Sequence, residues 1–237
     1  MRVITYNLHK ARRSGRSILN EAAAALRERS PDLLLCQEVF HTHCDTERQA
    51  VILGQHLGLE HAFGPNKFYE AGCHGNATFT RLPVLRAFNI DVTQSRFERR
   101  GILHTHLEWN DSVLEILNTH FSLTGRQRRK QLETLLDAIP DGDVPVLVAG
   151  DFNDWHGFLD RRIDRERHLR SALDVLSPTA RRTFPARRPF LALDRIYYRG
   201  LELEDVRVLR GEPWDVLSDH LPLEADFRIH EEAAGGA

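Results

Sequence analysis

Gly150-Asp151-Phe152-Asn153-Asp154 follows a short apolar run at residues 144–149, and Ser218-Asp219-His220-Leu221-Pro222-Leu223 follows a strand-like run at residues 214–217. Both segments bring polar side chains directly after residues that are expected to be buried. Carboxylates, amides and imidazoles are costly to bury unless they bind a metal ion, a substrate or one another. The two segments therefore predict a hydrolytic site at the ends of two strands.

The composition is that of an ordinary globular protein. The 237 residues are 41% hydrophobic and 28% charged, and the formal net charge is -2. So small a net charge gives no global electrostatic reason to bind nucleic acid or a membrane surface. The sequence contains no apolar run as long as a membrane span. We expect one domain over residues 1–230 and a disordered, Ala- and Gly-rich tail at residues 231–237.

Arginine is distributed unevenly, in clusters that lie in or beside predicted loops. Such clusters can be solvated faces, or they can form a positive rim around an anionic substrate. The sequence leaves both interpretations open. The clusters are Arg12, Arg13 and Arg16; Arg96, Arg99 and Arg100; Arg126, Arg128, Arg129 and Lys130; and Arg181, Arg182, Arg187 and Arg188.

The three cysteines, Cys36, Cys44 and Cys73, are odd in number and lack the spacing of a metal site. This pattern argues against a disulfide framework and favours a reducing compartment. Residues 3–6 already have the pattern of a core strand, which leaves no room for a cleaved secretory leader. We therefore expect a cytoplasmic protein, and we expect it to be a monomer.

Strand-like and helix-like runs alternate in an order that predicts an α/β fold. A strand, a helix and a strand open the chain, a β meander follows, and a second strand-helix-strand unit ends near Asp151. Two mixed β-sheets packed face to face, with helices outside, accommodate this order. The predicted strands are residues 2–8, 32–38, 77–80, 84–92, 101–108, 113–118, 144–149, 193–198, 206–209 and 223–227, and the predicted helices are residues 18–28, 46–57 and 125–139.

Polar segments stand at the ends of six predicted strands. Ligands bind along one edge of open α/β sheets, so these segments can converge on one cleft. Taken singly, each allows a structural explanation: Asn7 can cap or turn the chain, His120 can be a satisfied, half-buried histidine, and Asp151 with Asn153 can form an Asx turn. Chance alone does not explain the agreement of all six. The segments are Asn7, Gln37-Glu38, Asn118-Thr119-His120, Asp151 with Asn153, Asp194, and Asp219-His220.

A set of motifs extends this pattern along nearly the whole chain. They are, in order, Tyr6-Asn7-Leu8, Gln37-Glu38-Val39, Gly75-Asn76-Ala77, Thr119-His120-Phe121, Gly150-Asp151-Phe152-Asn153, Leu193-Asp194-Arg195-Ile196 and Ser218-Asp219-His220. Together they resemble the endonuclease/exonuclease/phosphatase superfamily, which includes DNase I-like nucleases, inositol polyphosphate 5-phosphatases and neutral sphingomyelinases. The resemblance spans residues 2–228 and is greatest to compact bacterial members. It implies a DNase I-like four-layer α/β sandwich and a phosphoesterase that depends on Mg²⁺ or Mn²⁺.

The resemblance also implies a role for each polar strand end. Glu38 is implied as the main metal ligand, with Asn7 and Asp219 beside it, and such oxygen donors suit Mg²⁺ or Mn²⁺. Asp151 is implied to orient or deprotonate the attacking water. Asn153 would fix that geometry and contact the phosphate.

The implied role of the histidines is to bind phosphoryl oxygens. His220 would contact one oxygen and be held by Asp194 through its other ring nitrogen, which favours the imidazolium form. His120 would donate to another oxygen as negative charge builds in the transition state. For Arg100 a solvated arginine is the alternative to a substrate contact. The residues expected to contact substrate are His74, Asn76 and Arg100.

A second metal hypothesis comes from a histidine-rich stretch between residues 41 and 61. Its spacing matches no structural zinc pattern, so a zinc site is not the favoured interpretation. The potential ligands are His41, His43, Cys44, His56 and His61.

The predicted activity is metal-dependent hydrolysis of a phosphodiester or phosphomonoester by attack of activated water at phosphorus. The substrate class stays open among nucleic acids, phospholipid head groups and phosphorylated small molecules. A nuclease is one alternative within this chemistry, and it would bind DNA or RNA in a strongly salt-dependent way through the arginine clusters. A non-catalytic module that holds a phosphorylated ligand is the alternative from another class.

Overall fold

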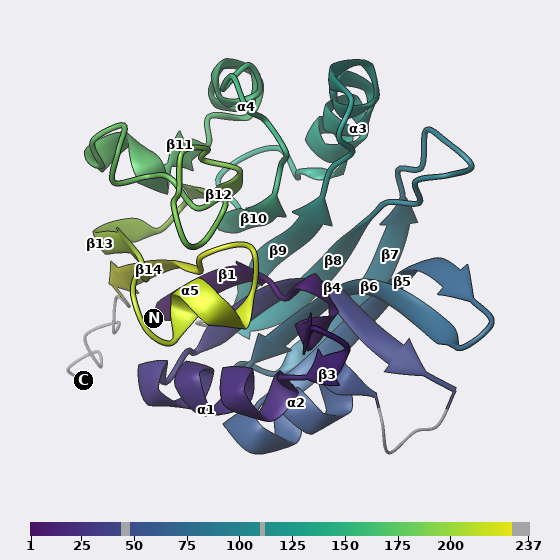
Figure 1. Ribbon diagram of the computed structural model, residues 1–237. Coiled ribbons are helices and arrows are strands. Elements are labelled where there is room, and N and C mark those ends of the chain that lie inside the picture. Colours follow the sequence, from purple (N-terminus) through teal and green to yellow (C-terminus); the bar gives the residue numbers. More distant parts are fainter. Residues whose placement is uncertain (44–47, 110–111, 229–237) are drawn as a thin grey trace, which may run out of the picture.

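The computed structural model describes residues 1–43, 48–109 and 112–228 (Figure 1). The predicted tail at residues 231–237 lies outside this part of the chain. Within it, two large sheets face each other. The first has the strand order β13 (Glu202–Val208), β14 (Leu223–Arg228), β1 (Arg2–Asn7), β4 (Leu33–Thr42), β6 (Gly72–Thr80) and β5 (Glu60–Tyr69). The second has the order β11 (Arg170–Ser171), β12 (Asp194–Arg199), β10 (Val146–Asp151), β9 (Ser112–His120), β8 (Gly101–Trp109) and β7 (Val84–Asp91).

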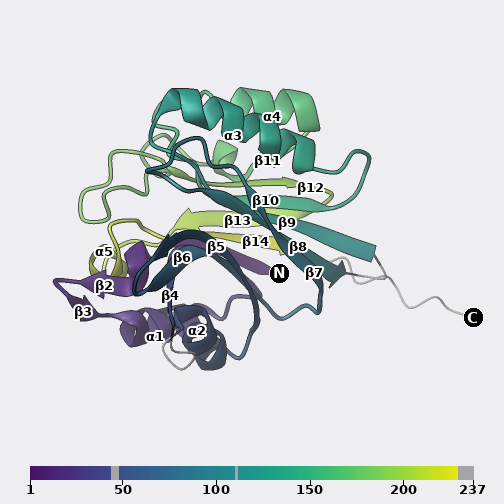
Figure 2. The ribbon, with the colours of Figure 1, turned by 90° about the vertical axis from the view of Figure 1, so that its right-hand side faces the viewer.

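Helices cover the outer face of each sheet. Figures 1 and 2 show α1 and α2 below the first sheet and α3 and α4 above the second. This arrangement confirms the predicted four-layer α/β sandwich. The described helices are α1 (Leu19–Arg29), α2 (Gln49–Leu57), α3 (Gly125–Ala138), α4 (Asp160–Arg167) and α5 (Trp214–Leu217), with 3₁₀ turns at His9–Ala11 and Ala172–Val175 and a short hairpin of β2 (Arg12–Arg13) and β3 (Arg16–Ser17).

Burial of apolar side chains on both faces of the sheets stabilises the layers. One cluster fills the space between the sheets and continues under α1 and α2, with Leu26 and Leu53 fully buried. A second cluster lies between the second sheet and its helices and includes Leu132 and Ile163. Each of these side chains contributes about 1.5–3 kcal/mol through removal from water. No helix among the described residues is long and apolar enough to cross a membrane.

Parallel strand pairing brings the predicted strand ends together. Strand β1 pairs in parallel with β4 through α1, and β9 pairs in parallel with β10 through α3. The predicted strand-helix-strand units are therefore confirmed. Because parallel neighbours end at the same edge, each unit places two polar strand ends side by side.

A buried polar link joins the two sheets beneath that edge. The Gln37 side-chain amide donates to Asn118 Oδ1 at 2.9 Å, and the Asn118 amide donates to the carbonyls of Cys36 and Ala77. Gln37 and Asn118 come from opposite sheets and are fully buried. This link fixes how one sheet lies on the other, because any slip would break all three hydrogen bonds of the buried Asn118 side chain to the first sheet.

Some predicted elements are wrong in type or extent. Residues 214–217 form the helix α5 instead of a strand, since Trp214 and Leu217 are both buried at helical spacing after Pro213. Strand β4 does not end at Glu38 but continues to Thr42 past a bulge. The predicted start of α2 at residues 46–47 lies outside the described residues.

Strand β5 and helix α4 were not predicted from the sequence. Strand β5 contains Pro65, which is compatible with a strand only at a sheet edge, and β5 is an edge strand. Helix α4 buries only Ile163, so it has no apolar repeat to recognise.

Candidate active site

Three neighbouring strands of the second sheet place three functional groups in one row. Asp151 at the end of β10 is in register with His120 on β9 and with Asp194 at the start of β12. Gly150 permits this close pairing: its φ is +145°, and a Cβ added there would lie 1.9 Å from the Thr119 carbonyl oxygen. Directly opposed side chains on adjacent strands lie within contact distance. The row therefore forms one face of the site.

The Asp151 carboxylate is the centre of the described contacts. Its Oδ2 accepts a hydrogen bond from Asn7 Nδ2 at 3.1 Å, and it lies 3.4 Å from His120 Nε2 and 3.6 Å from His220 Nε2. Burial raises the pKa of Asp151 to about 6, although the positive charge of His220 opposes the change. A carboxyl group with this pKa exchanges its proton near neutral pH.

His220 is held by Asp194 from the side opposite to Asp151. Its Nδ1 lies 2.9 Å from Asp194 Oδ2, and both side chains are buried. Burial alone would lower the pKa of His220, but the Asp194 and Asp151 carboxylates outweigh it and raise that pKa to about 10. His220 is therefore an imidazolium at neutral pH, as the sequence predicted. The net shift is in the opposite direction for His120, because burial lowers its pKa well below the usual value.

Asn153 belongs to a tight turn after β10. Its backbone N–H donates to Asp151 Oδ1 at 2.9 Å, and its Nδ2 donates to the Phe121 carbonyl at 2.9 Å. The Asx turn that the sequence allowed is thus present together with the polar cluster. The φ of Asn153 is +48°, a conformation that costs a non-glycine residue about 1–3 kcal/mol and is frequent at functional sites.

Glu38 and Asp219 both lie near His9 at the edge of the first sheet. The His9 Nδ1 atom lies 3.9 Å from Glu38 Oε2 and 3.4 Å from Asp219 Oδ1. Glu38 stands in a bulge of β4, where the register with β6 shifts between Cys36 and Val39, and its φ is +53°. A bulge turns a side chain away from its regular direction, and here it brings Glu38 toward the site.

The residues predicted to contact substrate lie around this cluster. His74 is buried, its ring stacks on Tyr69 with centroids 5.5 Å apart, and burial and then the charge of Lys10 lower its pKa to about 4. Asn76 donates both amide hydrogens to the carbonyls of Gly101 and Asn118. Its remaining atom, Oδ1, is an acceptor, so contact with a phosphate oxygen would need a bridging donor.

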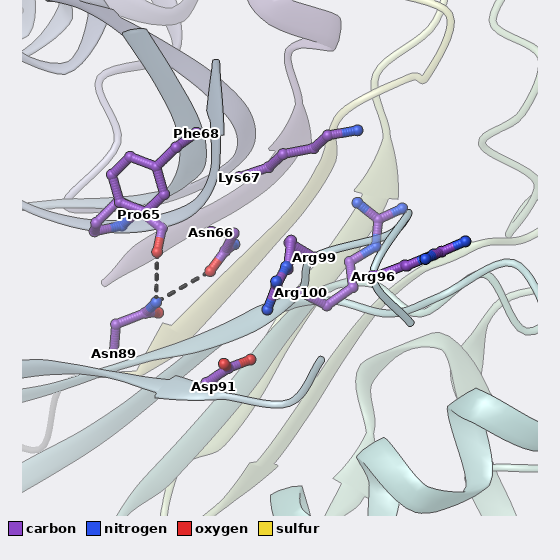
Figure 3. Close-up of a pocket in the computed structure, with 9 residues that line it drawn as sticks. All are labelled: Pro65, Asn66, Lys67, Phe68, Asn89, Asp91, Arg96, Arg99 and Arg100. Carbon is purple, nitrogen blue, oxygen red and sulfur yellow. Dashed lines mark hydrogen bonds between the residues drawn. The ribbon is translucent and has the colours of Figure 1, made fainter. Parts of the chain in front are cut away.

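Arg100 lines a basic cavity of about 560 Å³ next to the cluster (Figure 3). Its positive charge is one of the causes, after burial, that lower the pKa of His120. The cations in the wall outnumber the single carboxylate, that of Asp91. The lining residues are Pro65, Asn66, Lys67, Phe68, Asn89, Asp91, Arg96, Arg99 and Arg100.

A second cavity, of about 400 Å³, borders the other side of the cluster. His9 and Asp219 form part of its wall, and three arginines supply its positive charge. Of the four arginine clusters in the sequence, one lines the first cavity completely, one lines the second cavity in part, and a third contributes a single residue to the second cavity. The arginines of this cavity are Arg12, Arg13 and Arg187.

The histidine-rich stretch does not form a zinc site among the described residues. His41 Nε2 accepts a hydrogen bond from the Ala50 N–H at 3.3 Å, and its ring stacks on Phe63 with centroids 3.6 Å apart. The described groups with three potential metal ligands do not include His41. Cys44 lies outside the described residues. His41 is thus a structural histidine that packs the start of α2 on β4.

This packing predicts a pH-dependent contribution to stability. Burial and then the charge of Arg48 lower the pKa of His41 from 6.5 to about 4. As the pH falls from 6.5 to 4, the unfolded chain binds a proton that the folded chain excludes, so the free energy of unfolding decreases. Solvent screening limits the loss to about 1–2 kcal/mol. Urea unfolding at pH 7 and at pH 4 measures this decrease in the free energy of unfolding. In His41→Gln the decrease between the two pH values should be smaller than in wild type by the contribution of His41. An equal decrease in both proteins would contradict the assignment.

His9 and Ser218 belong to the site although the sequence analysis did not select them. Ser218 Oγ donates to the Asn7 carbonyl at 2.7 Å and so ties the last loop to the end of β1. The His9 N–H donates to Asn7 Oδ1 at 3.0 Å. Both residues lie within two positions of a predicted site residue, Asn7 or Asp219, and this proximity could have indicated them in the sequence.

A known protein family matches most of the chain. The sequence profile of the Endonuclease/Exonuclease/phosphatase family matches residues 4–220. The chain belongs to the endonuclease/exonuclease/phosphatase family. Members of this family are generally metal-dependent phosphoesterases. The family assignment agrees with the resemblance drawn from the sequence, and the described Asp151, Asp194 and His220 cluster, whose ligand atoms lie within 4.8 Å of one another, is consistent with a metal site of this family.

Relatives of this family member match it over almost its full length. An uncharacterized protein, YbhP, from Escherichia coli is 32% identical over 249 residues, which cover 96% of each chain. The crystal structure of an endonuclease/exonuclease/phosphatase from Beutenbergia cavernae superposes with a TM-score of 0.84 at 22% identity, covering 97% of this chain and 71% of that one. A mannosyl-6-phosphatase from Bacteroides thetaiotaomicron superposes with a TM-score of 0.74 at 16% identity, covering 96% and 99%. At these identities the two structures establish the common fold.

Proposed function

We propose that this protein hydrolyses a phosphate ester by attack of water at phosphorus, with Asp151 as the general base and a divalent cation at Glu38. One observation carries the proposal: side chains from both sheets converge on the Asp151 carboxylate and on the adjoining pair of Glu38 and Asp219. Such convergence combines a proton acceptor with positively charged and oxygen-donor groups.

Asp151 is suited to accept the proton of the attacking water. Its pKa of about 6 keeps it largely ionised at pH 7 while leaving it basic enough to bind a proton. The hydrogen bonds from Asn7 Nδ2 and the Asn153 N–H fix both carboxylate oxygens. As the water oxygen bonds to phosphorus, the water proton moves to Asp151 and the ester oxygen leaves.

The histidines are suited to stabilise the negative charge of the phosphoryl group. His220 is an imidazolium whose Nδ1 is occupied by Asp194, so its Nε2–H remains for a phosphoryl oxygen. His120 is neutral and offers one further N–H. Donors held in place before the reaction stabilise developing charge without reorganisation, and each is worth about 10²–10³ in kcat.

Glu38, Asp219 and Asn7 are the residues that would hold the cation. Their donor set fits a hard divalent ion, because the carboxylate of Glu38 on β4 and that of Asp219 in the loop before β14 both lie within 4 Å of one imidazole nitrogen, that of His9. Magnesium or manganese, when bound there, would neutralise charge on the phosphate and the leaving oxygen. The cluster of Asp151 and Asp194 with His220 suits this ion less well, since His220 would first have to lose the proton that both carboxylates stabilise.

The substrate that the surroundings favour is a phosphodiester with negative charge on both sides of the reacting phosphate. Arg96, Arg99 and Arg100 flank one side of the cluster, and Arg12 and Arg13 flank the other. A strand of DNA or RNA has this charge distribution. Phe68 is 71% exposed at the edge of the first cavity, where it can stack on a base.

Hydrolysis assays with Mg²⁺, Mn²⁺ or EDTA test the chemistry. Bis-p-nitrophenyl phosphate reports diesterase activity, p-nitrophenyl phosphate reports monoesterase activity, and single-stranded oligonucleotides test the proposed substrate. Turnover with metal that disappears in EDTA and in Asp151→Ala supports the proposal. Full wild-type activity in EDTA, or phosphate-ligand binding without any turnover, would reject it.

The charge of the cavities separates the two substrate classes. In Arg99→Glu, the KM for an oligonucleotide should rise by at least about tenfold, and KM should depend less steeply on salt concentration. The kinetics with small esters should change little. Lys130→Glu, on the outer helix α3, is the matched control. Preference for the monoester, with no effect of Arg99→Glu, would favour a phosphatase acting on a small molecule.

A further inference from the structure

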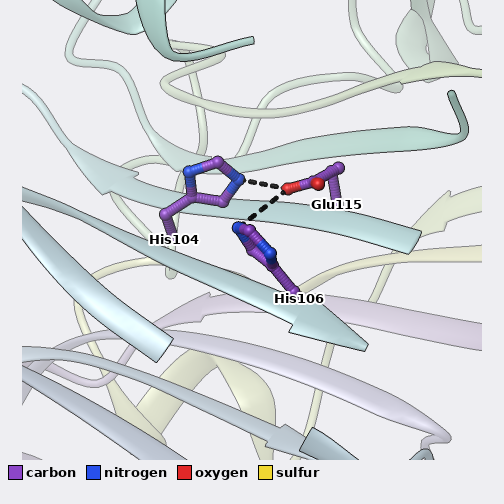
Figure 4. Close-up of side chains that lie close together, drawn as sticks. All are labelled: His104, His106 and Glu115. Carbon is purple, nitrogen blue, oxygen red and sulfur yellow. Dashed lines mark hydrogen bonds and ion pairs between the residues drawn. The ribbon is translucent and has the colours of Figure 1, made fainter. Parts of the chain in front are cut away.

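His104, His106 and Glu115 form a second polar cluster on the outer side of the second sheet (Figure 4). Residues i and i+2 of a strand point to the same face, so His104 and His106 project together from β8. Glu115 on β9 is in register with His106 and points to the same place. Glu115 also lies five residues before His120 on β9, which corresponds to about 16 Å along a strand. The cluster is therefore separate from the candidate active site.

The three side chains aim at one point. In Figure 4 both imidazole rings direct Nε2 toward the same carboxylate oxygen of Glu115. The Nε2 atoms lie 2.5 Å (His104) and 3.3 Å (His106) from Glu115 Oε2, and all three ligand atoms lie within 4.8 Å of one another. Two ligands of a tetrahedral zinc ion are about 3.4 Å apart, so a small opening of the His104 contact accommodates the ion.

An ion pair explains only part of this arrangement. His104 makes a hydrogen bond to Glu115, but the buried Nε2 atom of His106 has no hydrogen-bond partner among the described residues. At 3.3 Å from Glu115 Oε2 this nitrogen makes an ion pair when the ring is protonated, but it makes no hydrogen bond within the described part of the chain. A buried ring nitrogen without a hydrogen bond is costly unless a ligand occupies the space that it faces.

An aromatic ring covers the cluster on one side, but the cluster is still open to solvent. The Phe88 ring packs on His104 and His106, with centroids 4.9 Å and 5.6 Å away. The side chains of His106 and Glu115 are 24% and 12% exposed, so an ion can still reach them from solvent.

We propose that His104, His106 and Glu115 bind one divalent transition-metal ion, zinc by preference, with water as the fourth ligand. Two imidazoles and one carboxylate are a zinc donor set, whereas Mg²⁺ prefers oxygen ligands alone. The ion joins β8 to β9 from the outer face of the sheet. This site is independent of the proposed hydrolytic function.

Zinc titration of the metal-free protein tests the site. The protein is held in excess Mg²⁺ and titrated with Zn²⁺ against a chromophoric chelator, and Co²⁺ is used in parallel for its tetrahedral absorption bands. Wild type is expected to bind one equivalent and to melt at a higher temperature with Zn²⁺. His106→Ala and the nearly isosteric Glu115→Gln should each weaken this binding by at least about 100-fold.

Two further variants identify the binding location. Glu38→Gln removes the proposed catalytic ligand, and His56→Ala removes an exposed histidine of α2. Both should bind Zn²⁺ as wild type does. Wild-type affinity in folded His106→Ala and Glu115→Gln, or loss of the tight equivalent in Glu38→Gln, would overturn the proposal. Absence of any zinc binding that competes with the chelator would overturn it as well.

Discussion

Replacing Asp151 by asparagine is expected to lower kcat for the phosphodiester by about 10²–10⁴-fold, the usual contribution of a general base. The amide keeps the size of the side chain and an oxygen that can accept the Asn153 N–H, but it cannot take a proton from water. KM should change little, because the histidines and the arginines of the cavities remain. Burial raises the pKa of Asp151, so the charged carboxylate costs stability at pH 7 and the variant should be at least as stable as wild type.

Asp154→Asn is the matched control for this prediction. Asp154 lies in the same loop and is equally buried, but its Oδ2 accepts a hydrogen bond from the Leu159 N–H at 2.8 Å. We expect it to retain kcat within about tenfold of wild type, because its carboxylate stabilises the loop and does not meet the reacting atoms. Steady-state kinetics and thermal melts distinguish the two. A folded Asp151→Asn enzyme with more than a tenth of the wild-type kcat would remove Asp151 from proton transfer.

The strand ends of the site could be predicted from the sequence because they depend on local pattern. Asn7, His120 and Asp151 each terminate an apolar run, and the strands β1, β9 and β10 do end there. The connecting helices require parallel pairing, which brings those ends to one edge. Hydrophobic periodicity and the lengths of the connections therefore predict both the fold and the position of the strand ends that bear His120 and Asp151.

Long-range contacts account for what the sequence did not predict. Glu38 itself was predicted, but not the bulge of β4 on which it stands, because that bulge exists only in the pairing of β4 with β6. Gln37 and Asn118 are 81 residues apart, and their hydrogen bond appears only when the sheets face each other. The apolar run at residues 214–217 is too short for periodicity to separate a strand from one helical turn, and burial of both Trp214 and Leu217 in the folded protein favours the helix.

Replacing Glu38 by glutamine is expected to abolish stabilisation by Mg²⁺ and, with it, most of the activity. Wild type should melt at a higher temperature as Mg²⁺ is added, by an amount equivalent to about 2.7 kcal/mol at 100 times the Kd. Loss of a carboxylate ligand should weaken metal binding by at least about 100-fold, so the variant should show no such rise at the same concentration.

The melting temperatures of wild type and Glu38→Gln without metal provide a second test of this prediction. Glu38 and Asp219 both lie within 4 Å of His9 Nδ1, and their like charges repel each other when no cation lies between them. Glu38→Gln relieves that repulsion, so in EDTA it should melt at or above the wild-type temperature, whereas in Mg²⁺ wild type should be the more stable. Glu21→Gln removes an exposed carboxylate of α1 and should leave the Mg²⁺ response unchanged. If Mg²⁺ stabilised wild type and Glu38→Gln equally, the cation would bind elsewhere. A carboxylate ligand that loses its charge must weaken metal binding, and with it the stabilisation that metal binding gives to the fold.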